Sequence, residues 1–140
     1  MESPLSLVLR NDLSELERMA QAVSAWCRGN GVSAEAEYQI NLALDEIVSN
    51  VIRHGWKDEG EHQLLVQVSR TESELTVEVE DDAAPFNPLE APAPDITKPL
   101  EERPVGGLGI HLVRQIMDGL EYRRHDGKNL LVMKRKIAGA

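Results

Sequence analysis

Glu46 and Asn50 stand four residues apart within residues 42–55, a segment that otherwise has the apolar pattern of a helix. Side chains at this spacing lie on one helix face, about 5–6 Å apart at Cβ. An amide oxygen can coordinate a hard cation such as Mg²⁺, and a carboxylate can orient water or take a proton from a hydroxyl. A solvated surface pair is the commoner explanation of this spacing, so the pair is informative only in combination with residues further along the chain.

Two downstream features could complete a nucleotide site. Asp81 ends an expected strand, where a carboxylate can accept a hydrogen bond from an exocyclic amine such as that of adenine, although an Asp there more often starts a turn. Gly106, Gly107 and Gly109 precede an expected helix, whose N-terminus would offer free N–H groups to a phosphate. Their spacing fits neither the P-loop nor the Rossmann fingerprint, and a loop-to-helix junction also explains them.

The elements that must position these residues are predicted by hydrophobic periodicity. The expected strands are 5–10, 63–69, 74–81, 120–124 and 130–136, with a hairpin turn at Asp126 and Gly127. One helix is expected after a cap at Asn11 or Asp12, a second from a cap at Ser33 to Gly55, and a third restarting at Ile110. This order predicts an α+β two-layer sandwich in one domain, residues 1–140.

Residues 83–106 break this regular pattern. They contain six of the seven prolines and few large apolar residues. An unstructured segment of this length within a small domain is usually functional or mobile.

Composition limits the classes of function. The chain has 140 residues, enough for one domain with a buried core. A net charge of −9 argues against direct nucleic-acid binding, which needs Lys and Arg to neutralise phosphates. The lone Cys27 excludes an internal disulfide and fits a reducing compartment. Without a signal peptide or an apolar run near the roughly 20 residues of a membrane span, a cytoplasmic protein with no membrane contact is expected.

The order of these features resembles the N, G1 and G2 boxes of the GHKL superfamily of gyrase-type ATPases, heat-shock chaperones, mismatch-repair ATPases and histidine kinases. Within it, the anti-sigma-factor serine/threonine kinases of bacterial partner-switching systems are the most similar. Residues 81–88, DDAAPFNP, look like their Asp-Asp-Gly-x-Pro-Phe-Asp-Pro segment. Residues 106–114 are similar to their glycine box, and 97–99 to a tripeptide of their nucleotide lid. The resemblance covers residues 42–136.

The resemblance implies the Bergerat fold, with helices on one face of a mostly antiparallel mixed sheet and a nucleotide lid at about residues 83–106. By position, Glu46 is implied as the general base, Asn50 as the Mg²⁺ ligand beside the ATP phosphates, and Asp81 as the reader of adenine. The other implied nucleotide-binding residues are Arg53, Ala83, Phe86, Lys98, Arg103, Gly106, Gly107, Leu108, Gly109 and Ile110.

The function implied by the resemblance is an ATP- and Mg²⁺-dependent serine/threonine kinase that acts as an anti-sigma factor. Glu46 would assist a hydroxyl of an anti-anti-sigma (STAS-type) partner, and a sigma factor would be the second partner. A homodimer is also implied. One departure is Ala83, which stands where the family has a glycine that lets the backbone run close beneath adenine.

Three alternatives stay open on the sequence alone. Ala83 is compatible with a nucleotide-gated binding switch that performs no chemistry. A detached histidine-kinase catalytic module would need a phospho-acceptor histidine on another chain. The third alternative is an α+β domain with accidental motif agreement.

Overall fold

The computed structural model describes residues 3–58, 60–90 and 107–137. Its elements are, in chain order, β1 (Leu5–Arg10), α1 (Glu15–Gly29), α2 (Ala34–His54), β2 (Gln63–Arg70), β3 (Glu74–Asp81), the 3₁₀ turn η1 (Pro88–Glu90), α3 (Gly107–Ile116), β4 (Gly119–His125) and β5 (Lys128–Lys136). Every expected strand and helix is present. The third helix begins at Gly107 rather than at Ile110, which brings the glycine-rich segment into its first turn.

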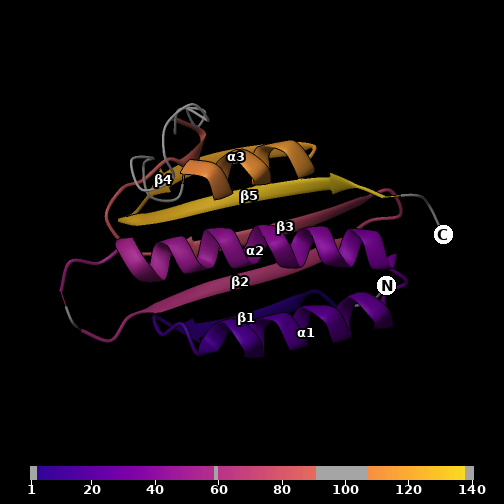
Figure 1. Cartoon of the computed structure of the whole chain (residues 1–140), viewed down its shortest axis with the longest axis horizontal. Coiled ribbons are helices and arrows are strands. Elements are labelled where there is room, and N and C mark those ends of the chain that lie inside the picture. Colours follow the sequence, from indigo (N-terminus) through magenta and orange to yellow (C-terminus); the bar gives the residue numbers. More distant parts are fainter. Residues whose placement is uncertain (1–2, 59, 91–106, 138–140) are drawn as a thin grey trace.

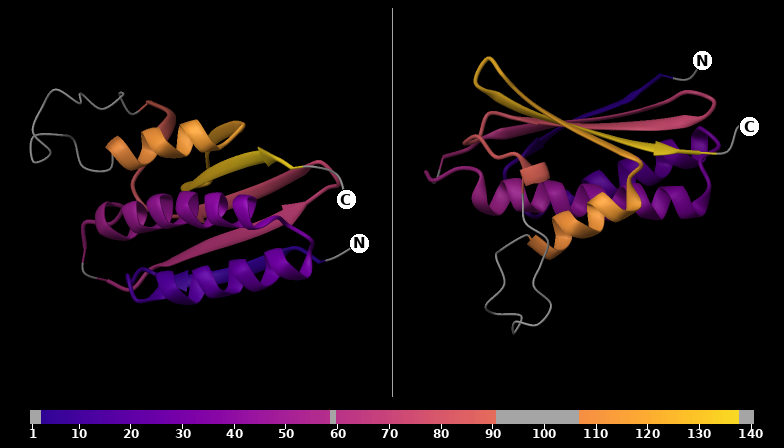
Figure 2. Two further views of the ribbon diagram at one scale, coloured as in Figure 1. Left: turned by 45° about the vertical axis from the view of Figure 1, so that its right-hand side comes forward. Right: turned by 90° about the horizontal axis from the view of Figure 1, so that it is seen from above.

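The described strands form one sheet in the order β1-β2-β3-β5-β4, and α1, α2 and α3 cover one of its faces (Figure 1). The edge-on view in Figure 2 shows the two layers, with the other face of the sheet left open by the described residues. The expected α+β two-layer sandwich is therefore confirmed. Helix α2 lies between α1 and α3, at the centre of the helical layer.

Each described strand pair is antiparallel, so the sheet is antiparallel rather than mixed in the part of the chain described. Two helices separate β1 from β2, which pairs with β1 in the opposite direction. Strand β4 takes the edge, and the tight hairpin at Asp126 and Gly127 then brings β5 back between β4 and β3. This arrangement gives β5 an antiparallel partner on both sides.

The core lies between the sheet and the helices because both layers are amphipathic. On α2, Ile40, Leu44 and Val48 recur at helical spacing and are fully buried. On β3, Leu75, Val77 and Val79 point to the helices, and Thr76 and Glu78 between them point to the open face. In the described ranges, no helix is both long enough and apolar enough to cross a bilayer.

Candidate functional site

Helix α2 carries Glu46 and Asn50 on the side that meets α3. The helix begins where Ser33 Oγ accepts a hydrogen bond from the N–H of Ala36 at 3.2 Å. A Cβ added to Gly109 would lie only 2.0 Å from Glu46 Oε2, so the first turn of α3 packs directly against this carboxylate. The fold therefore joins the helix residue and the glycine segment that are separate features in the sequence.

Asn50 and Asp81 line one cavity of about 250 Å³ at the ends of α2 and β3. Its other lining residues are Val51, His54, Gly55, Ala83, Ala84, Pro85, Phe86 and Asn129. A smaller cavity of about 30 Å³, also lined by Asn50 and Asp81, reaches toward Ile47 and Tyr122. The amide and the acid thus share a concave, largely apolar site with few polar groups, as small-molecule sites usually do.

Asp81 is only 6% exposed, and one of its carboxylate oxygens is hydrogen-bonded within the protein. Its Oδ1 accepts from the N–H of Ala83 at 3.0 Å and from Asn129 Nδ2 at 2.9 Å. Burial raises the pKa of this carboxyl, while the two hydrogen bonds act in the opposite direction. No described residue donates to Oδ2, which leaves that oxygen able to accept a hydrogen bond from a ligand.

Asn129 on β5 was not among the predicted site residues. It lies in the cavity wall and donates to the carbonyl oxygen of Ala84 at 3.0 Å. A signal was present in the sequence, because Asn129 precedes Leu131 and Met133 at the inward spacing of a strand. A polar residue at such a position needs buried partners, but only the fold shows what they are.

Ala83 is accommodated by Gly55, the residue that follows α2. Ala83 is 3% exposed, and its methyl group would be 2.8 Å from a Cβ on Gly55. The N–H of Ala84 donates to the carbonyl oxygen of Gly55 at 3.1 Å. The absence of a side chain at Gly55 therefore provides the space that the extra methyl group of Ala83 occupies.

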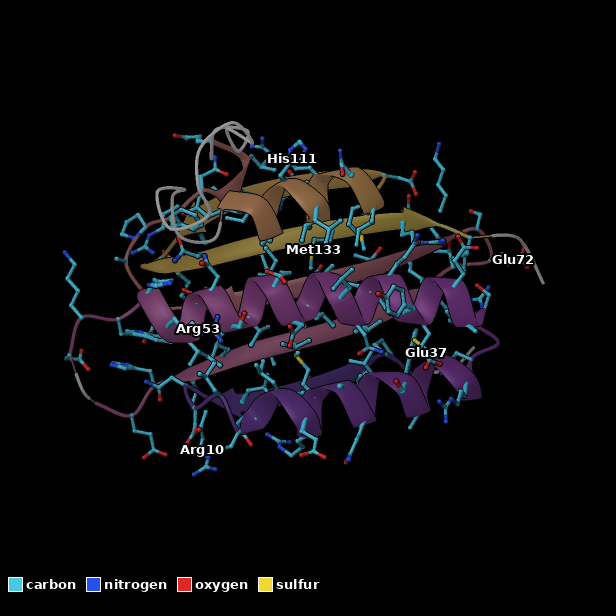
Figure 3. The ribbon with its side chains drawn as sticks, viewed as in Figure 1. Arg10, Glu37, Arg53, Glu72, His111 and Met133 are labelled. Atoms are coloured by element: carbon cyan, nitrogen blue, oxygen red, sulfur yellow. The ribbon has the colours of Figure 1, made fainter. Side chains whose placement is uncertain are left out.

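Of the remaining predicted residues, some lie at or near the cavity, one points elsewhere and others lie outside the described residues. Phe86 lines the cavity and is 48% exposed, and Ile110 is buried on α3. Arg53, labelled in Figure 3, is exposed on the last turn of α2 and does not line the cavity. Lys98, Arg103 and Gly106 lie outside the described residues, as does the side chain of Leu108.

Arg114 of α3 makes contacts that keep it away from the cavity. Its Nη2 donates to the carbonyl oxygens of Pro88, at 3.2 Å, and Leu89. The guanidinium thus links α3 to η1, the turn that follows the cavity-lining residues 83–86.

The comparisons with known proteins agree with this geometry. A family model described as the histidine kinase-like ATPase domain matches residues 9–135. The chain belongs to this family of ATPase domains.

Relatives within the family are protein kinases by name. The chain is 28% identical over 101 residues to the serine/threonine-protein kinase BtrW of Bordetella bronchiseptica, covering 72% of this chain and 71% of BtrW. It is 27% identical over 108 residues to the serine-protein kinase RsbW of Listeria monocytogenes, covering 74% and 69% of the two chains. The predicted resemblance to the anti-sigma-factor kinases of the GHKL superfamily is thereby confirmed.

The fold is also that of a solved relative. A crystal structure of the RsbU and RsbW domains of a Mycobacterium tuberculosis protein matches 99% of this chain with a TM-score of 0.70. The identity is 14%, and the match covers 34% of that longer chain. This likeness supports the fold assignment alone.

Proposed function

We propose that this protein is an ATP-dependent serine/threonine protein kinase of the anti-sigma type. The observation that carries the proposal is the shared cavity of Asn50 and Asp81, with Glu46 against the start of α3. Membership in an ATPase family and the kinase names of the relatives support the same activity.

Each end of the site suits one part of ATP. Asp81 Oδ2 would accept a hydrogen bond from the adenine amine, and Val51 and Phe86 would supply apolar walls for the ring. The N-terminus of α3 would meet the phosphates, because helix N-termini present free N–H groups and a favourable dipole. Glu46, beside Gly109, would then take the proton from a serine or threonine hydroxyl.

Asn50 would hold Mg²⁺ together with the ATP phosphates. No group of three or more His, Cys, Asp or Glu in the described ranges could hold a metal by itself. An amide oxygen in the cavity fits a cation that takes few protein ligands and binds mainly phosphate and water. When bound, Mg²⁺ would neutralise phosphate charge during the transfer.

The proposed protein substrate is an anti-anti-sigma (STAS-type) partner, and the second partner is a sigma factor. The relatives named RsbW and BtrW support this partner-switching class. A net charge of −9 is compatible with a basic, DNA-binding sigma factor. We place this exchange in the cytoplasm.

Transfer of labelled phosphate from ATP to a cognate anti-anti-sigma protein tests the assignment. Glu46→Gln should slow transfer by about 10²- to 10⁴-fold, because general-base catalysis typically contributes that much. ATP affinity should stay near that of the parent, since Glu46 does not line the cavity that holds Asp81.

Three outcomes separate the hypotheses. Equal rates for the parent and Glu46→Gln would show that Glu46 is not the base. ATP binding without phosphorylation of any partner would favour the nucleotide-gated switch. Labelled histidine on a partner chain would favour a histidine-kinase module instead.

We also propose that two copies associate through the open face of the sheet. A groove of about 550 Å³ on this face includes Val8, Leu65, Glu80 and Lys128, and Val8 is 54% exposed. On the same face, β3 carries Glu74, Glu78 and Glu80 and the neighbouring β5 carries Lys128, Lys134 and Lys136, with Glu74 opposite Lys136 and Glu80 3.6 Å from Lys128. A two-fold arrangement could set the acidic row of each copy against the basic row of the other, which supports a second copy as the occupant.

A further inference from the structure

Asn129 occupies a position where an amide is costly. Its side chain is 6% exposed, and the next two inward-facing residues of β5, Leu131 and Met133, are also buried. Burying an amide without partners destabilises a fold, so its contacts must explain its presence.

The amide nitrogen of Asn129 is surrounded by oxygen acceptors. Nδ2 lies 2.9 Å from Asp81 Oδ1, 3.0 Å from the carbonyl oxygen of Ala84 and 3.3 Å from that of Ala83. Two N–H hydrogens serve these three acceptors. None is left to donate to a ligand in the cavity.

The amide oxygen of Asn129 is occupied as well. It accepts a hydrogen bond from the Tyr122 hydroxyl and one from the N–H of Phe86 at 3.4 Å. Rotating the amide by half a turn would set its oxygen against the three acceptors. The surrounding groups therefore fix one orientation of the amide.

The consequence appears at Asp81. Asn129 and the N–H of Ala83 both bind Oδ1, which leaves Oδ2 as the oxygen available to a ligand. Arg124 Nη1 donates to the carbonyl oxygen of Ala83 at 2.9 Å and braces the same turn from β4. Asn129 thus contacts both the Asp81 carboxylate and the backbone of residues 83–86, and Arg124 adds a second contact to that backbone.

We infer that Asn129, held by Tyr122, is a positioning residue for purine recognition that orients Asp81 without touching the nucleotide. This inference rests on the proposed function. A carboxylate oxygen in a fixed place accepts from the amine of adenine and repels the carbonyl oxygen that guanine carries at the same ring position. Asn129 therefore contributes to selection of ATP over GTP.

The test measures ATP and GTP binding by calorimetry, and KM and kcat for phosphate transfer, on the full chain with Mg²⁺. Asn129→Asp replaces N–H donors by an oxygen that faces three acceptors, so the Kd and KM for ATP should rise by about tenfold or more. The kcat should stay within about twofold, because the lost interaction stabilises the bound substrate and the transition state equally. Weak GTP binding should change little, so selectivity for ATP falls.

Two further variants serve as a second test of the positioning role and as a matched control. Tyr122→Phe keeps the ring but removes one hydrogen bond, and it should weaken ATP binding by about threefold even if Asn129→Asp folds poorly. Gln21→Glu makes the same amide-to-carboxylate change on the exposed face of α1 and should leave both nucleotides unaffected.

The outcomes distinguish this inference from the proposed function. If the parent protein binds no ATP, the proposed function fails first. If the parent binds ATP and both Asn129→Asp and Tyr122→Phe bind it equally well, only the positioning role is overturned. Equal losses for ATP and GTP, with a lower melting temperature, would also overturn it, because they indicate a merely structural residue.

Discussion

Two glycines beside the candidate site leave space that a side chain would fill. Gly109 is needed for space, since its missing side chain leaves room for the Glu46 carboxylate. Gly55 does the same for the methyl group of Ala83. A Cβ on Gly55 would also lie 2.6 Å from the carbonyl oxygen of Val51, so both glycines are explained by close packing rather than by an unusual backbone conformation.

Gly109→Ala should reduce phosphate transfer by at least about tenfold, because the new methyl group would displace the Glu46 carboxylate that we propose as the base. The added Cβ would lie 2.0 Å from Oε2 and 2.8 Å from Cδ of Glu46, so either the side chain or α3 must move. Steady-state kinetics with an anti-anti-sigma substrate measures the effect.

Gly29→Ala is the matched control for Gly109→Ala. Gly29 also lies in a helix, but a Cβ there would have no atom within 4 Å. Its kinetics should equal those of the parent. Full activity of Gly109→Ala would mean that Glu46 need not occupy the position described.

At the scale of elements, one carboxylate fastens β1 to α1. Glu15 Oε2 accepts from the N–H of Arg10 at 2.9 Å and from Arg18 Nη2 at 2.8 Å. The hydrogen bond from Arg18, with that from Arg10, lowers the pKa of Glu15 from 4.5 to about 2. The edge strand therefore depends on an ionised side chain.

The pH dependence of this link has a defined sign. Because the pKa of Glu15 is lower in the folded chain than in the unfolded chain, its contribution to stability is present above pH 4.5 and is lost as the pH falls toward 2. The difference in urea midpoint between the parent and Glu15→Gln should thus be constant above about pH 5 and shrink as the pH falls from about 5 to about 2.

Glu17→Gln, on the exposed side of the same helical turn, provides the comparison for Glu15→Gln. Its urea midpoint should match that of the parent at each pH. A Glu15→Gln difference that stays constant across the same acid range would refute the assigned ion pairing.

At the scale of the whole molecule, one face of the sheet is covered by helices and the other is open in the part of the chain described (Figure 2). Leu65 and Leu130 on that open face are half-buried, and Val132 is 7% exposed. Apolar residues flanked by opposite charges are typical of a surface that another protein covers.

Glu80→Lys should weaken self-association by about tenfold or more, because like charges placed opposite each other repel across an interface. Sedimentation velocity over a range of protein concentrations measures this shift. Adding Lys128→Glu to the same chain exchanges the two charges, which lie 3.6 Å apart within one copy, and should restore the parent behaviour.

Glu72→Lys makes the same charge change in the turn between β2 and β3 and should leave association unchanged. A parent protein that stays monomeric at high concentration would refute the proposed dimer. An unchanged dimer in Glu80→Lys would instead place the interface elsewhere.

The sequence by itself determined the local structure and the chemical types of the site. Ser33 caps α2 as predicted, since capping depends on residues three positions apart. Asp126 and Gly127 form the predicted hairpin turn with positive φ angles of 51° and 75°. Glu46, Asn50 and Asp81 were likewise predicted as site residues from spacing and order along the chain.

Tertiary structure decided which residues meet. Of the two predicted caps of α1, Asn11 instead donates to the carbonyl oxygen of Gly60 and accepts from the N–H of His62. Asp12 Oδ1 accepts from the N–H of Ser14 at 2.9 Å, just before α1 begins at Glu15. The bond between Asn129 and Asp81 spans 48 positions of sequence. Such contacts leave no pattern in the local sequence, because they depend on how the strands and helices pack against one another in the folded chain.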